Sequence, residues 1–185
     1  MNIAVYCSSW PNLDQRYHDI ARALGRWIGR NGHTLVYGGV DAGLMHTVAA
    51  ATKEMGGNVT GVITRKFMPL ADPLVDQLIT TADLSERKAR MYVMSDLHVV
   101  LPGGVGTLDE WLSALSQMVV DKRQHVGMII VNLQGQYDAT MEQLRGFAQG
   151  PFAGDRHLAL MCEVHDESHL LQALERLTWQ NVDSK

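Results

Sequence analysis

Short apolar runs alternate with segments of helical periodicity along the chain, and this alternation constrains the fold more than any other feature. Ile3–Cys7 and Thr34–Gly39 are rich in β-branched and aromatic residues. Between them, Ile20, Leu24 and Ile28 recur at a spacing that places them on one face of a helix. A strand, a helix and a second strand in this order form a βαβ unit with parallel strands. The pattern therefore predicts an α/β fold with a mostly parallel sheet and helices on both faces.

The same alternation continues toward the C-terminus. A proline-containing segment, Phe67–Thr81, is the least regular part of the chain, and we expect a loop there. With 185 residues, of which 46% are hydrophobic, the chain is long enough for one compact core. We predict a single nucleotide-binding domain spanning residues 1–185. The further expected helices and strands are a helix at Leu44–Met55, a strand at Val59–Ile63, a helix through ERKARMYVMS, a strand in LHVVLP, a helix from Thr107 to about Val120, a strand in VGMIIVN, a helix near Tyr137–Ala148, a weak strand near Leu160–Val164 and a final helix in ESHLLQALERL.

Composition excludes several classes of function. The formal net charge is −4, and no window concentrates lysine or arginine, so a nucleic-acid partner is not expected. No run approaches the roughly 20 apolar residues that cross a bilayer, so no membrane partner is expected either. Two cysteines, Cys7 and Cys162, and an N-terminus without a basic region and a long apolar core are typical of a reduced, cytoplasmic protein. A small molecule is the expected partner.

Two glycine-rich segments follow predicted strands. In an open parallel sheet, ligands bind outside the carboxyl ends of the strands, and Gly38–Gly43 and Pro102–Thr107 both fall there, as does Ser8. Glycines at positive φ, followed by a helix beginning at Thr107, would place backbone N–H groups around an anion. Neither G-x-G-x-x-G nor G-K-[ST] occurs, which favours a mononucleotide or sugar monophosphate. The alternative is that these glycines only form tight turns.

Two pairs of polar residues have more than one interpretation. Thr107 and Glu110 fit a capping box at a helix start, and Asp83 and Glu86 fit a second one. If Thr107 faces a phosphate, however, Glu110 faces the attached sugar, where a carboxylate stabilises positive charge at the anomeric carbon. Arg87, one residue after the second pattern, offers a guanidinium to the same ligand.

The segment RKARM (Arg87–Met91), followed by PGGVGTLDE (Pro102–Glu110), resembles the paired motifs of the LOG family, the cytokinin riboside 5'-monophosphate phosphoribohydrolases. The resemblance implies a Rossmann-like homodimer that hydrolyses the N-glycosidic bond of a nucleoside 5'-monophosphate, with no metal or organic cofactor. By position, Arg87 and Glu110 match the catalytic pair of the family. The implied substrate-binding residues are Lys88, Met91, Gly103, Gly104, Gly106, Thr107, Gly38, Gly39, Ser8 and Ser116.

Several positions depart from the family pattern. Val40 and His46 stand where glycines are common, and Ser85 replaces a usual histidine. The W-x-Q that often follows the glycine loop is absent, and Gln117 and Val119 occupy those places. The base of the substrate is therefore left open between adenine and a cytokinin-type base. The alternative function is a carrier that binds a phosphorylated small molecule without turning it over.

Overall fold

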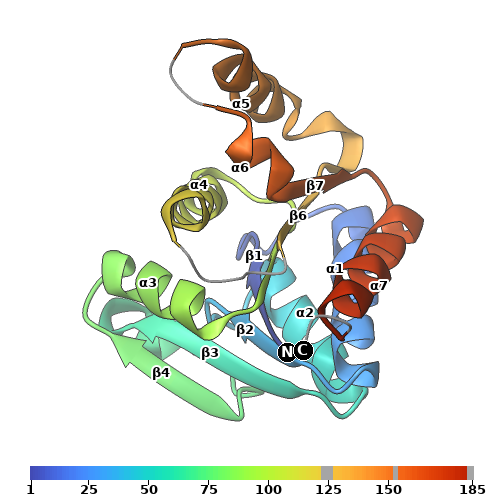
Figure 1. The fold of residues 1–185 in the computed structure, drawn as a ribbon. Coiled ribbons are helices and arrows are strands. Elements are labelled where there is room, and N and C mark those ends of the chain that lie inside the picture. Colours follow the sequence, from blue (N-terminus) through green and yellow to red (C-terminus); the bar gives the residue numbers. More distant parts are fainter. Residues whose placement is uncertain (122–126, 152–153, 183–185) are drawn as a thin grey trace.

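The chain forms a seven-stranded, all-parallel sheet in a computed structural model that describes residues 1–121, 127–151 and 154–182. The strand order is β4-β3-β2-β1-β5-β6-β7 (Figure 1). The predicted α/β fold with a parallel sheet is therefore confirmed. The strands are β1 (Asn2–Tyr6), β2 (Thr34–Tyr37), β3 (Asn58–Thr64), β4 (Gln77–Thr81), β5 (Leu97–Val100), β6 (Gly127–Val131) and β7 (Met161–Val164).

Helices cover both faces of the sheet. Helices α1, α2 and α7 supply side chains to one buried apolar cluster, and α3, α4 and α5 supply side chains to another (Figure 1). No helix in the described part of the chain has the length and apolar character needed to span a membrane. The helices are α1 (Gln15–Arg30), α2 (Gly43–Glu54), α3 (Leu84–Met94), α4 (Val105–Val120), α5 (Asp138–Gln149), α6 (Arg156–Ala159) and α7 (Glu167–Val182), with short 3₁₀ turns η1 (Arg65–Leu70) and η2 (Leu133–Gly135).

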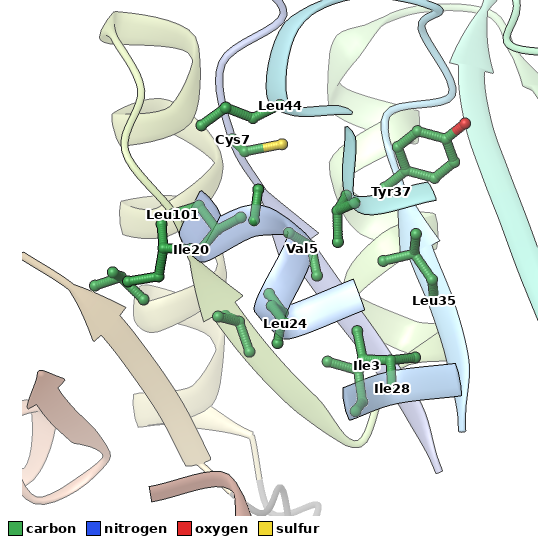
Figure 2. Packing of buried hydrophobic residues seen from close by; sticks show 14 of the residues in the cluster. Ile3, Val5, Cys7, Ile20, Leu24, Ile28, Leu35, Tyr37, Leu44 and Leu101 are labelled. Carbon is green, nitrogen blue, oxygen red and sulfur yellow. The ribbon is translucent and has the colours of Figure 1, made fainter. Parts of the chain in front are cut away.

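The central strand β1 shows how the sequence builds both layers. Ile3 and Val5 point into the cluster beneath α1, α2 and α7, whereas Ala4 and Tyr6 point into the opposite cluster. Figure 2 shows the first of these clusters, in which Ile3 and Val5 pack with residues of α1. Because successive residues of a strand face opposite sides, a strand buried on both sides must be apolar throughout.

The segment Phe67–Thr81 is not a simple loop. It contains most of η1 and all of β4, which pairs in parallel with β3 from Thr60↔Gln77 to Thr64↔Thr81. Strand β4 lies at the edge of the sheet, and only Thr81 in it is fully buried. An edge strand of this kind needs no continuous apolar run, which explains why the sequence pattern missed it.

The strand order reverses at β1, and this reversal locates the site. Strand β1 pairs with β2 on one side and with β5 on the other. The connections that leave β2 and β5 therefore run to opposite faces of the sheet, and a crevice opens between them at the carboxyl end of β1. Both glycine-rich segments of the sequence leave strands at this edge.

Candidate functional site

A cavity of about 330 Å³ lies at the carboxyl ends of β1, β2 and β5. Its volume is in the range that holds small-molecule ligands. Its polar lining comes from the loop after β1, from α3 and from the start of α4, and its apolar lining comes from the β2–α2 connection, α2, η1 and the start of α3. The lining residues are Cys7, Ser8, Ser9, Val40, Met45, Phe67, Leu70, Leu84, Arg87, Gly104, Gly106, Thr107 and Glu110.

The glycine loop after β5 forms the N-terminus of α4. Gly104 is the N-cap with φ −98° and ψ −152°, and the helix begins at Val105, two residues before the predicted start at Thr107. The predicted positive φ is wrong for Gly103, Gly104 and Gly106. Gly104 is an N-cap with an extended backbone, and Gly106 lies in the first turn of the helix, where φ is negative. Positive φ occurs instead in the other loop, at Gly39 and Gly43. The first N–H groups of α4 have no acceptor within the helix and are therefore available to a ligand.

The three glycine positions of this loop exclude a side chain for different reasons. A Cβ at Gly103 would lie 2.0 Å from Thr107 Oγ1, so this residue must be glycine for the loop to approach the first turn of α4. A Cβ at Gly104 or Gly106 would meet no atom within 4 Å. Both of these residues line the cavity, so a side chain there would occupy ligand space.

Side chains from the β6–α5 connection hold the glycine loop in place. Gln136 Nε2 donates to the Gly103 carbonyl oxygen at 2.8 Å, and the Tyr137 hydroxyl donates to the Leu101 carbonyl oxygen at 2.8 Å. From the loop after β1, the Ser8 N–H donates to the Pro102 carbonyl oxygen at 3.2 Å. The loop is thus anchored on both sides before any ligand binds.

Of the two possible capping boxes, one forms in a modified version, in which the glutamate bonds the N–H one residue before the N-cap. At α3, Asp83 Oδ1 accepts a hydrogen bond from the Glu86 N–H at 2.8 Å, and Glu86 Oε2 accepts one from the Ala82 N–H at 2.9 Å. The expected helix start near Asp83 is therefore confirmed. At α4 the prediction is wrong, because Thr107 and Glu110 lie inside the helix and both are buried.

The side chain of Glu110 pairs instead with Arg87. Arg87 Nη2 donates to Glu110 Oε1, and the exposed fractions of the two side chains are only 10% and 4%. Both residues line the cavity. Arg87 Nε is buried and has no hydrogen-bond partner among the described residues, so the guanidinium keeps one donor free. The structure thus brings together the two residues that the resemblance marks as catalytic, 23 positions apart in the sequence.

Burial perturbs the carboxyl group of Glu110. Its pKa rises to about 7, chiefly because burial disfavours the charged form, although the nearby Arg87 opposes the rise. Burial also raises the pKa of the Cys7 thiol, which lies in the same cavity, so that thiol stays protonated and unreactive. Glu110 is therefore the group in the cavity whose charge changes near neutral pH.

Several predicted substrate-binding residues do not line the cavity. Lys88 Nζ binds Asp109 Oδ1 at 2.6 Å and Ser113 Oγ at 3.0 Å, on the outer side of the α3–α4 contact. Met91 is fully buried in the core, and Ser116 is exposed on α4. Three more predicted residues, Gly38, Gly39 and Gly103, also lie outside the lining but next to the walls. Gly38 lies against Met45 and Arg87, and Gly39 lies against Gly61.

Sequence reasoning missed the apolar wall of the cavity. Val40, Met45, Phe67, Leu70 and Leu84 come from four separate segments and face the polar groups of α3 and α4. Leu70 and Leu84 are exposed, with exposed fractions of 55% and 48%. The apolar residues Phe67 and Leu70, in a proline-containing segment where the pattern predicts a loop, are a signal in the sequence that could have pointed to this wall.

Comparison with known proteins matches this chain to one family. The family model described as "Possible lysine decarboxylase" matches residues 45–174. The cytokinin riboside 5'-monophosphate phosphoribohydrolase of Mycobacterium tuberculosis is 32% identical over 173 residues, which cover 92% of this chain and 91% of that protein. The protein of the same name from Rhodococcoides fascians is 36% identical over 118 residues, but the match spans 62% of this chain and 60% of that protein.

Solved structures show the same fold at lower identity. A molybdenum cofactor binding protein from Rippkaea orientalis has a TM-score of 0.73 and 20% identity, and the match covers 96% of each chain. The Moco carrier protein of Chlamydomonas reinhardtii has a TM-score of 0.73 and 23% identity, with 97% of this chain covered and 98% of that one. At these identities the structural likeness shows the fold alone. The family is shown instead by the family model and by the relatives of similar sequence. The chain belongs to the LOG family, whose model carries the description of a possible lysine decarboxylase.

Proposed function

We propose that this protein hydrolyses the N-glycosidic bond of a purine or cytokinin-type nucleoside 5'-monophosphate, releasing the free base and ribose 5-phosphate. The observation that carries this proposal is the buried pair of Arg87 and Glu110 inside a cavity at the N-terminus of α4. An anion site alone needs no carboxylate, whereas cleavage of a glycosidic bond does. The names of the relatives from Mycobacterium tuberculosis and Rhodococcoides fascians support the same reaction.

In this proposal the 5'-phosphate binds at the start of α4. The first N–H groups of the helix and the positive end of its dipole attract an anion. Gly104 and Gly106 leave room for it, and the buried hydroxyl of Thr107 adds a donor. Ser8, on the loop after β1, faces the same space. No lysine follows the loop as it does in nucleoside-triphosphate sites, so one phosphate group is the expected ligand.

Glu110 then acts at the sugar. As a carboxylate it stabilises positive charge that develops at the anomeric carbon and accepts a proton from the attacking water. The water oxygen bonds to the anomeric carbon, the base leaves with the electrons of the glycosidic bond, and the base takes up a proton. Arg87 orients the carboxylate. A pKa near 7 suits a group that must accept a proton at neutral pH.

We also propose that the chain acts as a cytoplasmic homodimer that packs through α3 and α4. Apolar side chains on these helices are exposed, namely Leu84, Val93, Val105, Leu112 and Val120. Among them, Val93, Leu112 and Val120 have exposed fractions of 60%, 40% and 77%. Ser116 lies between Leu112 and Val120 at helical spacing, so this face of α4 would meet the second copy. Light scattering at decreasing protein concentration tests the dimer, and a monomer mass at all concentrations would refute it.

The proposed role of Glu110 is tested by removing its charge. Glu110→Gln keeps the shape of the side chain and an oxygen that accepts from Arg87, so we expect it to fold and to bind the nucleotide while turnover falls by orders of magnitude. The matched control is Glu142→Gln, the same change at an exposed residue of α5. Equal turnover of Glu110→Gln and wild type would refute the proposal. Nucleotide binding by the wild type without product would favour a carrier instead.

A further inference from the structure

Three polar side chains converge just behind the apolar wall of the cavity. Asp41 comes from the β2–α2 connection, His46 from the first turns of α2, and Asp72 from the segment between η1 and β4. His46 Nδ1 lies 2.8 Å from Asp41 Oδ1 and 3.1 Å from Asp72 Oδ2. In the sequence, each of the three residues lies one or two positions after a residue that lines the cavity, namely Val40, Met45 or Leu70.

Backbone hydrogen bonds fix the two carboxylates in place. Asp72 Oδ1 accepts from the Leu74 N–H at 3.0 Å, and the Asp72 N–H donates to the Gly39 carbonyl oxygen at 2.9 Å. This leaves Asp72 Oδ2 directed at His46. The Asp41 N–H donates to the Leu70 carbonyl oxygen at 2.9 Å, which ties the β2–α2 connection to η1. Backbone contacts therefore hold Asp41 and Asp72 in place, in addition to the contacts that each makes with His46.

The charges of this group are not balanced by the protein. The side chain of Asp72 is completely buried, with an exposed fraction of 0%. Among the described residues, neither Asp41 nor Asp72 forms an ion pair with a lysine or an arginine. His46 offers at most one positive charge against two carboxylates, one of them buried, and a buried carboxylate without a full counter-ion is unfavourable. A divalent cation balances both charges at once.

A buried hydroxyl also lies beside the group. Tyr37 is fully buried, and its hydroxyl oxygen makes no hydrogen bond of normal geometry to any described residue. Figure 2 shows its ring against the apolar cluster and its hydroxyl pointing away from the labelled apolar side chains. Burial raises the pKa of Tyr37, and the nearby carboxylate of Asp72 raises it further by its charge and as a hydrogen-bond acceptor. Asp72 is therefore the polar neighbour of this hydroxyl as well as of His46.

We propose that Asp41, His46 and Asp72 bind one divalent transition-metal ion, Zn²⁺ or Mn²⁺. Ligand atoms about 2.0–2.2 Å from such an ion lie roughly 3.0–3.5 Å apart, and the three donor atoms here all lie within 4.8 Å of one another. An imidazole nitrogen with two carboxylate oxygens suits these ions better than Mg²⁺, which prefers oxygen alone. The side chains of Asp41 and His46 are 47% and 42% exposed, so the ion can enter from solvent and water can complete its coordination.

The role of this ion is structural. It joins the β2–α2 connection, α2 and the segment after η1, and each of these carries a residue of the cavity wall. The ion lies outside the cavity lining and takes no part in bond cleavage, so the site stands or falls independently of the proposed reaction.

Titration calorimetry of the chelator-treated, full-length protein tests the site with ZnCl₂, MnCl₂ and, as a comparison, MgCl₂. We expect one Zn²⁺ or Mn²⁺ per chain, weaker binding of Mg²⁺, and a higher melting temperature in the presence of the bound ion. His46→Gln and Asp41→Asn should each lower the affinity by about tenfold or more. The matched control is His169→Gln, because His169 Nδ1 lies 2.8 Å from Asp166 and has no second carboxylate partner among the described residues.

The outcomes separate a metal site from a simple histidine–carboxylate contact. Saturable binding that His46→Gln weakens and His169→Gln does not supports the site. No saturable binding to the wild type, or equal affinities of the wild type and His46→Gln, overturns it. If His46→Gln fails to fold, Asp41→Asn gives the same readout, because Asp41 is half-exposed and its loss leaves the core intact.

Discussion

The buried carboxyl group of Glu110 predicts that the protein becomes less stable as the pH rises from 5 to 8. Burial raises the pKa of Glu110 from 4.5 to about 7 in the folded protein. Between these two values the folded protein keeps a proton that the unfolded chain has released. The contribution of this group is therefore fully present below about pH 4.5 and is lost as the pH rises through about 7. Since one pKa unit corresponds to about 1.4 kcal/mol, the loss amounts to about 3 kcal/mol.

Urea unfolding at a series of pH values measures this loss. Glu110→Gln carries an amide that does not titrate, so its free energy of unfolding should lack the decrease of about 3 kcal/mol that the wild type shows between pH 5 and 8. Other titrating groups are common to both proteins, and they cancel when the two curves are subtracted. If the free energies of unfolding of the two proteins change in parallel with pH, burial does not raise the pKa of Glu110. Glu110 would then not be a base that titrates near neutral pH.

Three further changes have distinct expected results. Gly103→Ala forces a Cβ against Thr107 and should destabilise the protein by about 1–3 kcal/mol in thermal unfolding, whereas Gly104→Ala should cost about 1 kcal/mol or less but raise KM, because its methyl group enters the cavity. A larger loss of stability for Gly104→Ala than for Gly103→Ala would contradict this. Arg87→Ala leaves Glu110 buried without its partner and should cost about 3–5 kcal/mol in urea unfolding as well as nearly all turnover. In assays of wild-type kcat/KM against pH, we expect activity to rise as Glu110 ionises near pH 7, and a flat profile there would contradict its role as base.

The layers of the fold could be predicted from the sequence because most strands are buried on both faces. Ile3–Cys7 and Thr34–Gly39 read as continuous apolar runs, and the structure places β1 and β2 there. Strand β4 could not be found in this way, since it lies at the edge of the sheet and gains its place from pairing with β3 rather than from its own apolar residues. Edge strands depend on contacts that are distant in the sequence, and a local pattern does not record them.

The candidate site was predictable in position but not in its contacts. Glycines after β5 and the strand reversal at β1 together indicate an anion site. The T-x-x-E spacing of Thr107 and Glu110 is the same in a capping box and in the interior of a helix, and only the start of α4 at Val105 separates the two. The pairing of Glu110 with Arg87 depends on how α3 and α4 pack, which no local spacing expresses.

The central claim is most directly tested by the products formed from a nucleoside monophosphate and from the matching nucleoside. We expect the purified protein to release base and ribose 5-phosphate in equal amounts from a monophosphate in a panel that includes AMP. Cleavage of the corresponding nucleoside should be slower by about two orders of magnitude or more, because phosphate binding at α4 orients the glycosidic bond. Comparable rates for AMP and adenosine, or tight binding of monophosphates with no free base, would contradict the account.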